Sequence, residues 1–194
     1  TRDLAEKAIA DAIQKGCNII FTTTPEFVQA SVQAAIAHPE VKILNCSLNT
    51  SHRYIRTYYA RMYEAKFLMG AIAGAMAENG QLAYIADYPI FGTIANINAF
   101  ALGAKMVNPR AQIYLEWSTL KDVDLGIAMD NVIKKGVTVV SGQDMVIPED
   151  ASRYFGLYHI EKEGPRNLAM PLWHWGKFYE QLIRTIMDGT WKYD

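Results

Sequence analysis

The feature of the sequence that most constrains its fold is a regular alternation of short apolar runs with amphipathic segments. The apolar runs predicted to form strands are 18–22, 41–47, 81–87, 111–118 and 137–142, with shorter ones at 153–158 and 168–173. The segments predicted to form helices are 4–15, 25–37, 58–78, 94–106, 123–135 and 177–187. This spacing predicts βα units on a mainly parallel sheet. Because the strands are apolar almost throughout, helices are expected on both faces of each sheet.

The helix predicted over 58–78 has a face made of small residues. Gly70 and Gly74 lie one helical turn apart, so this face lets the helix axis approach a sheet or another helix closely. The same spacing joins helices inside membranes. Its apolar part, 67–77, is shorter than the roughly 18 residues of a spanning helix, which favours packing within the protein. The aromatic residues at the start of this helix are expected to cover a seam between two lobes: Tyr58, Tyr59 and Tyr63.

A polar stretch without periodicity, 48–57, marks the expected seam. The prediction is a partial N-terminal lobe over 1–50, a linker and long crossover helix over 51–78, and a C-terminal lobe over 79–194. Only two strands precede the seam, and two strands rarely form an independent sheet. The first lobe is therefore expected to be truncated, and the chain to be a piece of a longer protein.

Composition and motifs exclude several classes of function. Hydrophobic residues make up 51% of the chain, charged residues 20%, and the net charge is −1, so we expect a globular protein without a nucleic-acid partner. The two cysteines, Cys17 and Cys46, are interpreted as buried free thiols. The histidines have no metal-ligand spacing, and the chain has neither a phosphate loop nor a nucleophile elbow. We therefore expect no metal, no cofactor and no enzymatic activity.

Polar and aromatic residues recur just after the predicted strands. In open α/β sheets, ligands bind at the carboxyl ends of the strands. Aromatic rings that stack on a ligand, with polar groups that read its rim, suit a flat ligand with polar edges. The candidate ligand-binding residues are Thr23, Thr24, Phe27, Ser47, Asp87, Tyr88, Trp117, Gln143, Asp144, Tyr158 and Trp173. Packing at the ends of the sheet is the alternative for each residue taken alone.

The most suggestive local motif is "VVSGQDMVIPED", residues 139–150. Gly142 allows the backbone to approach a ligand closely, and Gln143 and Asp144 offer hydrogen-bonding groups. The alternative is a turn in which Asp144 caps the segment that follows.

Four stretches together resemble the basic membrane protein family, the substrate-binding lipoproteins of ABC importers that include the purine nucleoside receptors. The matching stretches are "RMYEAKFLMGAIAGAM", "AYIADYPI", "INAFALGAKMVNPRAQIYLEW" and "MDGTW". The resemblance is dense over 52–118 and thinner elsewhere.

The resemblance implies a type I periplasmic-binding-protein fold, with two doubly wound α/β lobes of parallel sheet and a ligand cleft between them. It also implies a ligand that is a purine nucleoside, a purine base or a similar flat heterocycle. Trp117 best matches the family's stacking aromatic residue. Where the family has the Asp and Lys that hold a ribose, this sequence has Tyr158 and Trp173. A free purine therefore fits at least as well as a nucleoside.

The function that the resemblance implies is the solute-binding component of an ABC importer. Its partners would be a small-molecule ligand and a transporter permease. It would work outside the cytoplasm and meet the membrane only through a lipid anchor beyond this chain. The alternative is a ligand-sensing regulatory domain of the same fold that is not coupled to transport. An enzyme is the least favoured hypothesis, because the acidic residues and histidines show no catalytic spacing.

Overall fold

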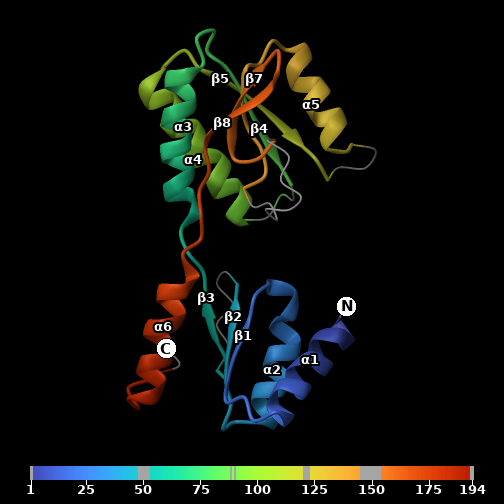
Figure 1. Cartoon of the computed structure of the whole chain (residues 1–194), viewed down its shortest axis with the longest axis vertical. Helices are drawn as coiled ribbons and strands as arrows, with labels where there is room; N and C mark the ends of the chain where they lie inside the picture. Colours follow the sequence, from blue (N-terminus) through green and yellow to red (C-terminus); the bar gives the residue numbers. More distant parts are fainter. Residues whose placement is uncertain are drawn as a thin grey trace. The chain divides into compact units, whose positions relative to one another are not determined.

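A computed structural model describes residues 2–47, 53–87, 89, 91–119, 123–144 and 154–192 of the chain. The chain divides into two compact units (Figure 1). Unit 1 comprises Thr1–Ala60 together with His174–Asp194, and unit 2 comprises Arg61–Trp173. Each unit has its own sheet and its own core, which confirms the α/β fold class.

Unit 1 is a three-stranded sheet with helices on both faces. Its strands pair in the order β1-β2-β3, and both pairs are parallel. The strands are β1 (Ile19–Thr22), β2 (Lys42–Cys46) and β3 (Arg56–Tyr58). The helices are α1 (Arg2–Gln14), the 3₁₀ turn η1 (Pro25–Phe27), α2 (Val28–Ala37) and α6 (Trp175–Met187).

Alternate residues of β2 point to opposite faces of the unit 1 sheet and so enter two separate cores. Ile43 packs with α1 and α2, which lie together on one face (Figure 1). Leu44 packs on the other face with Tyr58 and with Leu182 of α6. The strand is apolar on both sides because both faces are covered.

Unit 2 is a five-stranded sheet in the order β5-β4-β6-β7-β8. The pairs β5–β4 and β4–β6 are parallel, and the pairs β6–β7 and β7–β8 are antiparallel. The strands are β4 (Gln81–Ala86), β5 (Gln112–Trp117), β6 (Val139–Ser141), β7 (Leu157–Glu161) and β8 (Gly164–Ala169). The helices are α3 (Met62–Met76), α4 (Phe91–Val107) and α5 (Leu125–Lys134).

Helices α3 and α4 cover one face of the unit 2 sheet and α5 covers the other (Figure 1). The small-residue face of α3 packs against α4, which confirms the predicted close approach to a second helix. A Cβ added at Gly70 would lie 2.0 Å from the carbonyl oxygen of Phe100, and one at Gly103 would lie 1.9 Å from that of Phe67. Only glycine therefore fits where these two helices touch.

The predicted helix over 58–78 begins later than expected, because the residues before it form a strand. Arg56–Tyr58 is β3, which pairs with β2, and α3 starts at Met62. Tyr58 is buried in the core of unit 1 rather than covering a seam, whereas Tyr59 and Tyr63 are exposed. Burial of Tyr58 explains why a short strand forms in a polar stretch that lacks a hydrophobic period.

The strands predicted at 153–158 and 168–173 are shifted in the structure. They form the β7–β8 hairpin, in which Glu161 pairs with Gly164 across a two-residue turn. Residues 164–167, which lie between the two predicted strands, belong to β8. Pro165 is tolerated there because β8 is an edge strand of its sheet.

The compact units differ from the predicted segments 1–50, 51–78 and 79–194. Helix α6 belongs to unit 1, because its apolar face covers the three-stranded sheet. Helix α3 belongs to unit 2, where it packs on α4. Cys17, interpreted as buried, is exposed in the loop between α1 and β1, and Cys46 is half-buried.

Candidate functional site

Three neighbouring parallel strands of unit 2 end at the same edge of their sheet. We call this the carboxyl edge, and define it by the residues that end or follow β4, β5 and β6. Four of the predicted ligand-binding residues lie there: Asp87, Trp117, Gln143 and Asp144. The strand alternation predicts that these four lie at one end of one sheet, and the structure has them there; their role in ligand binding stays a prediction.

The carboxyl edge also holds a buried lysine. The ammonium group of Lys66, from α3, forms an ion pair with Oδ1 of Asp144. The Lys66 side chain has 0% of its surface exposed, whereas that of Asp144 has 24%. The cation is thus sealed inside the unit and its carboxylate partner faces partly outward.

The ring of Tyr84, on β4, supports the buried ammonium group. The centroid of this ring lies 5.2 Å from the Lys66 Nζ, within the range of a cation–π interaction. Tyr84 is itself buried, and burial raises the pKa of its phenol well above the usual value. It therefore stays neutral and presents its ring to the lysine.

Lys66 and Asp144 depend on each other to remain charged. Burial lowers the pKa of Lys66, and the negative charge of Asp144 opposes that shift. Burial raises the pKa of Asp144, and the positive charge of Lys66 opposes that shift in turn. Removing either partner leaves the other as an uncompensated charge in a poorly solvated position.

Asp87 adds a second carboxylate to the carboxyl edge. Its charge acts on both Lys66 and Asp144, raising the pKa of each. Asp87 is exposed, and its Oδ1 accepts a hydrogen bond from the hydroxyl of Thr93 at 3.4 Å. Its backbone oxygen accepts one from Thr119 at 2.5 Å, which fixes the loop after β4.

The two remaining residues of this edge, Trp117 and Gln143, differ in their exposure to solvent. Trp117 is half-buried and packs against the core on the side of α3 and α4. Gln143 is exposed, and its backbone oxygen accepts a hydrogen bond from Gly156 N–H at 2.6 Å. Both positions leave part of the side chain free to meet a ligand.

Tyr158 does not share a hollow with Trp117. It is 1% exposed, and its hydroxyl donates to Sδ of Met129 at 3.0 Å within the core on the side of α5. Trp117 packs on the opposite face of the sheet. Because β7 starts rather than ends near Tyr158, this residue lies in the sheet interior, and we leave it out of the proposed site.

Trp173 is half-buried and follows the last strand of unit 2. Tyr88, also a candidate, lies outside the described residues.

The candidate residues of unit 1 lie around the carboxyl ends of β1 and β2. Thr23 is exposed, Thr24 and Phe27 are half-buried, and Ser47 is buried. The backbone N–H of Ser47 donates to the carbonyl of Tyr58 at 3.1 Å. Ser47 therefore helps to join β2 to β3 at that end of the sheet.

A buried polar network that sequence reasoning missed holds the turn after β1. Asn45 is fully buried, and its Nδ2 donates to Thr22 Oγ1 and to the carbonyl of Thr24, both at 2.8 Å. The hydroxyls of Thr22 and Ser31 lie 2.9 Å apart. A polar residue within the apolar run of β2 is the signal that could have identified Asn45.

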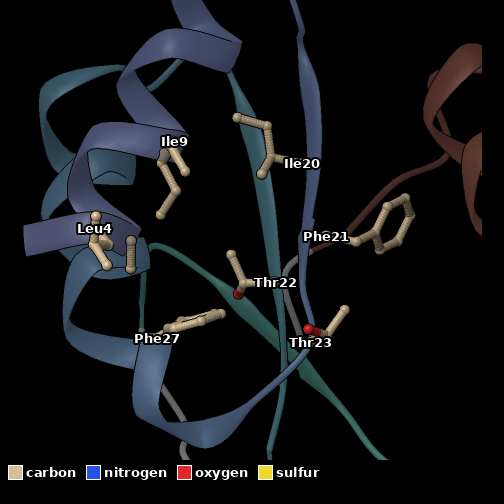
Figure 2. A pocket seen from close by; sticks show the side chains of 9 residues that line it. Leu4, Ile9, Ile20, Phe21, Thr22, Thr23 and Phe27 are labelled. Carbon is tan, nitrogen blue, oxygen red and sulfur yellow. The ribbon is translucent and has the colours of Figure 1, made fainter. Parts of the chain in front are cut away.

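Unit 1 also contains a pocket of about 440 Å³ beside β1 (Figure 2). Figure 2 shows Ile9, Ile20, Thr22 and Phe27 around the hollow, with Phe21 pointing to the other face of the strand. The walls are mostly aliphatic, and the Thr22 hydroxyl is already bonded to Asn45. The pocket offers apolar contact but few groups to orient a polar ligand.

Within the described residues, no group of three or more His, Cys, Asp or Glu side chains is placed to hold a metal ion. Among the helices that the structure describes, none combines the length and the apolar character that crossing a bilayer requires.

Curated relatives match nearly the whole chain. A purine-binding protein of Brucella abortus is 27% identical over 201 residues, which cover 97% of this chain and 57% of that protein. An ABC transporter glucose-binding protein of Haloferax volcanii is 26% identical over 200 residues, which cover 98% of this chain and 51% of that protein. The chain thus spans about half the length of the curated relatives it matches.

Solved structures show the same fold at low identity. An ABC transporter solute-binding protein from Conexibacter woesei superposes with a TM-score of 0.59 and 16% identity, covering 73% of this chain and 49% of that one. A transcriptional activator of the comK gene from Bacillus halodurans superposes with a TM-score of 0.67 and 15% identity, covering 99% of this chain and 71% of that one. These likenesses concern the fold alone.

The sequence model of one family, described as ABC transporter substrate-binding protein PnrA-like (Bmp), matches residues 2–149. This match covers most of both units and includes the helix that carries Lys66 and the strands that form the carboxyl edge. The resemblance to the basic membrane protein family is therefore confirmed, and the chain belongs to the Bmp family of ABC transporter substrate-binding proteins.

Proposed function

We propose that the chain is the ligand-binding part of an ABC importer and that its ligand is a purine base, a purine nucleoside or a similar flat heterocycle. The ligand would be bound unchanged and passed to a transporter permease. The whole protein would work outside the cytoplasm, held at the membrane by a lipid anchor. The observation that carries the proposal is the carboxyl edge of unit 2, where a half-buried indole ends β5 and a lysine-paired carboxylate follows β6, the two strands that flank β4.

The chemistry of this edge suits a planar heterocycle that carries hydrogen-bond donors. Trp117 offers an indole surface on which a planar ring can stack, and Asp144 and Gln143 offer acceptors for ring N–H and amino groups. One curated relative is named for purine binding and another for glucose binding. A purine would use both the aromatic residue and the acceptors, and the resemblance to the purine nucleoside receptors adds to this choice.

Native mass spectrometry of the protein purified from cells tests the proposal directly. A retained molecule with the mass of a purine base or nucleoside supports it. Calorimetric titration with adenine, hypoxanthine, adenosine and glucose then ranks the classes. Binding of glucose in preference to all three purine compounds would overturn the ligand class and leave the family assignment intact.

Replacing Trp117 tests its role in stacking. Trp117→Ala is expected to weaken binding of the preferred purine by about 5- to 150-fold, which corresponds to the ~1–3 kcal/mol of one base–aromatic stack. Leu115→Ala is the matched control, because Leu115 lies on the same strand with 40% of its surface exposed. Equal affinities for the two variants in calorimetry would show that the indole does not contact the ligand.

A further inference from the structure

The charged groups at the carboxyl edge of unit 2 differ in how deeply they are buried. Among the residues of this edge that the structure describes, the cation is Lys66, which is fully buried and forms an ion pair with Oδ1 of Asp144. Asp144 is partly exposed, and Asp87, whose field reaches both groups, is exposed. An approaching ligand therefore meets two carboxylates in front of a cation that it cannot touch.

We propose that Lys66 is a buried counter-ion that holds the Asp144 carboxylate as a fixed, ionised acceptor, and that the acidic edge so formed selects ligands with hydrogen-bond donors and no phosphate group. This inference rests on the proposed function and adds to it a positioning residue and a rule of selectivity. Lys66 acts on the ligand through Asp144 and does not touch it.

The geometry argues against the opposite role, in which Lys66 binds an anionic ligand. A lysine that receives a phosphate must expose its ammonium group, and this one has no exposed surface and is paired with a carboxylate. A phosphate group carries a charge of about −1.5 to −2 at neutral pH, so it would meet Asp144 and Asp87 as a like charge. Like charges in a partly desolvated site repel more strongly than they do in water.

The pair also explains why Asp144 makes a suitable acceptor. Lys66 contacts Oδ1, which leaves Oδ2 outside this ion pair on a side chain that remains 24% exposed. Because the lysine fixes the carboxylate from behind, less side-chain entropy is lost when a ring N–H or a hydroxyl group of the ligand binds it.

The selectivity is measured by calorimetry with adenosine and adenosine 5′-monophosphate as probes, at low salt. The wild-type chain is expected to bind adenosine at least about tenfold more tightly than the monophosphate. Asp144→Asn is expected to weaken the binding of adenosine and to lower the ratio of adenosine affinity to monophosphate affinity by about tenfold. The matched control is Asp130→Asn, an exposed residue of α5 with the same change of charge, which is expected to keep the wild-type ratio.

The positioning role is measured by a double-mutant cycle. In the wild-type background, Lys66→Met is expected to weaken adenosine binding about tenfold. In the Asp144→Asn background the same change is expected to weaken adenosine binding less than about twofold, because the lysine acts through that carboxylate. Lys105→Met, on the exposed side of α4, is the control and is expected to leave both values unchanged. Circular dichroism checks that each variant is folded. Asp87→Asn, at an exposed position, keeps the selectivity testable if the buried variants do not fold.

The outcomes separate the two proposals. If the wild-type chain binds none of the purine probes, the proposed function fails and this inference fails with it. If it binds adenosine but accepts the monophosphate equally well, the selectivity is overturned and the function stands. If Lys66→Met causes the same loss of adenosine affinity in both backgrounds, Lys66 has a structural role only, and its role as a counter-ion is overturned.

Discussion

At the scale of single residues, Lys66 and Asp144 show how far local pattern reaches. Asp144 stands out in the sequence because it follows a Gly at the end of an apolar strand. Lys66 does not stand out, since a single lysine in a predicted helix is normally interpreted as exposed to solvent. Its partner lies 78 residues away, so only the packing of α3 over β4 and β6 reveals that it is buried. The sequence analysis thus predicted the hydrogen-bond acceptors of the carboxyl edge and missed its cation, Lys66.

Tyr158 shows the converse limit at the same scale. The sequence places it at a strand end, where ligand-binding residues gather, but the strand starts there and the ring is buried. A shift of a few residues in a predicted strand is enough to move a side chain from the rim of a sheet to its interior.

Tyr58 gives a prediction for alkaline pH. Burial first, and then the hydroxyl of Tyr179 at 3.1 Å, raise the pKa of Tyr58 above its usual value near 10. Above about pH 10 the unfolded chain therefore loses a proton that the folded chain keeps, and stability falls by about 1.4 kcal/mol per pH unit for each such tyrosine. Tyr58→Phe is expected to make this fall less steep in urea denaturation between pH 9.5 and 11. Tyr63→Phe, at an exposed position, serves as the control, and an identical slope for the two variants would contradict the assignment.

At the scale of elements, the pairing of α3 with α4 depends on residues that have no side chain. The sequence predicted a close approach from Gly70 and Gly74, and did not single out Gly103, which contributes from the partner helix. Most strands and helices were predicted because apolar runs and amphipathic segments alternate clearly. Strand β3 was not, because three residues are too few to show a period and its stability comes from the burial of Tyr58.

Gly103→Ala tests this helix pair. The added Cβ would lie 1.9 Å from a backbone oxygen of α3, so the helices must separate, and a loss of about 1–3 kcal/mol or more in stability is expected. Gly176→Ala, in the first turn of α6, is the matched control, because no atom lies within 4 Å of the new Cβ. In urea denaturation Gly103→Ala should lower the free energy of unfolding, whereas Gly176→Ala should leave it nearly unchanged.

At the scale of the whole molecule, the division into units does not follow the order of the chain. Unit 1 takes its sheet from residues before 61 and its last helix from residues after 173. A contiguous partition, which is the natural prediction from sequence, assigns that helix to the second lobe. Nothing in the amphipathic pattern of α6 says which sheet it covers, and only its contacts with Leu44 and Tyr58 do so.

Leu182→Ala tests whether the two units are independent in stability. Leu182 is 6% exposed in the core between α6 and the unit 1 sheet, and removing such a side chain costs about 2–5 kcal/mol. Hydrogen exchange followed by mass spectrometry should show lost protection in 19–22 and 42–46 and unchanged protection in 81–86. Met187→Ala, on the same helix with 78% of its surface exposed, should change neither. Loss of protection in both sheets would show that the units unfold together.

The discontinuity of unit 1 has a consequence for how the protein is made. More than a hundred residues separate β3 from α6 along the chain, which at ~5–20 residues per second corresponds to roughly ten seconds of translation. During that interval unit 2 emerges complete, while one apolar side of the earlier sheet, with Leu44 and Tyr58, still lacks its cover. Unit 2 can therefore fold before the sheet of unit 1 receives the helix that covers this side, and the uncovered apolar side is the part that a chaperone would need to shield.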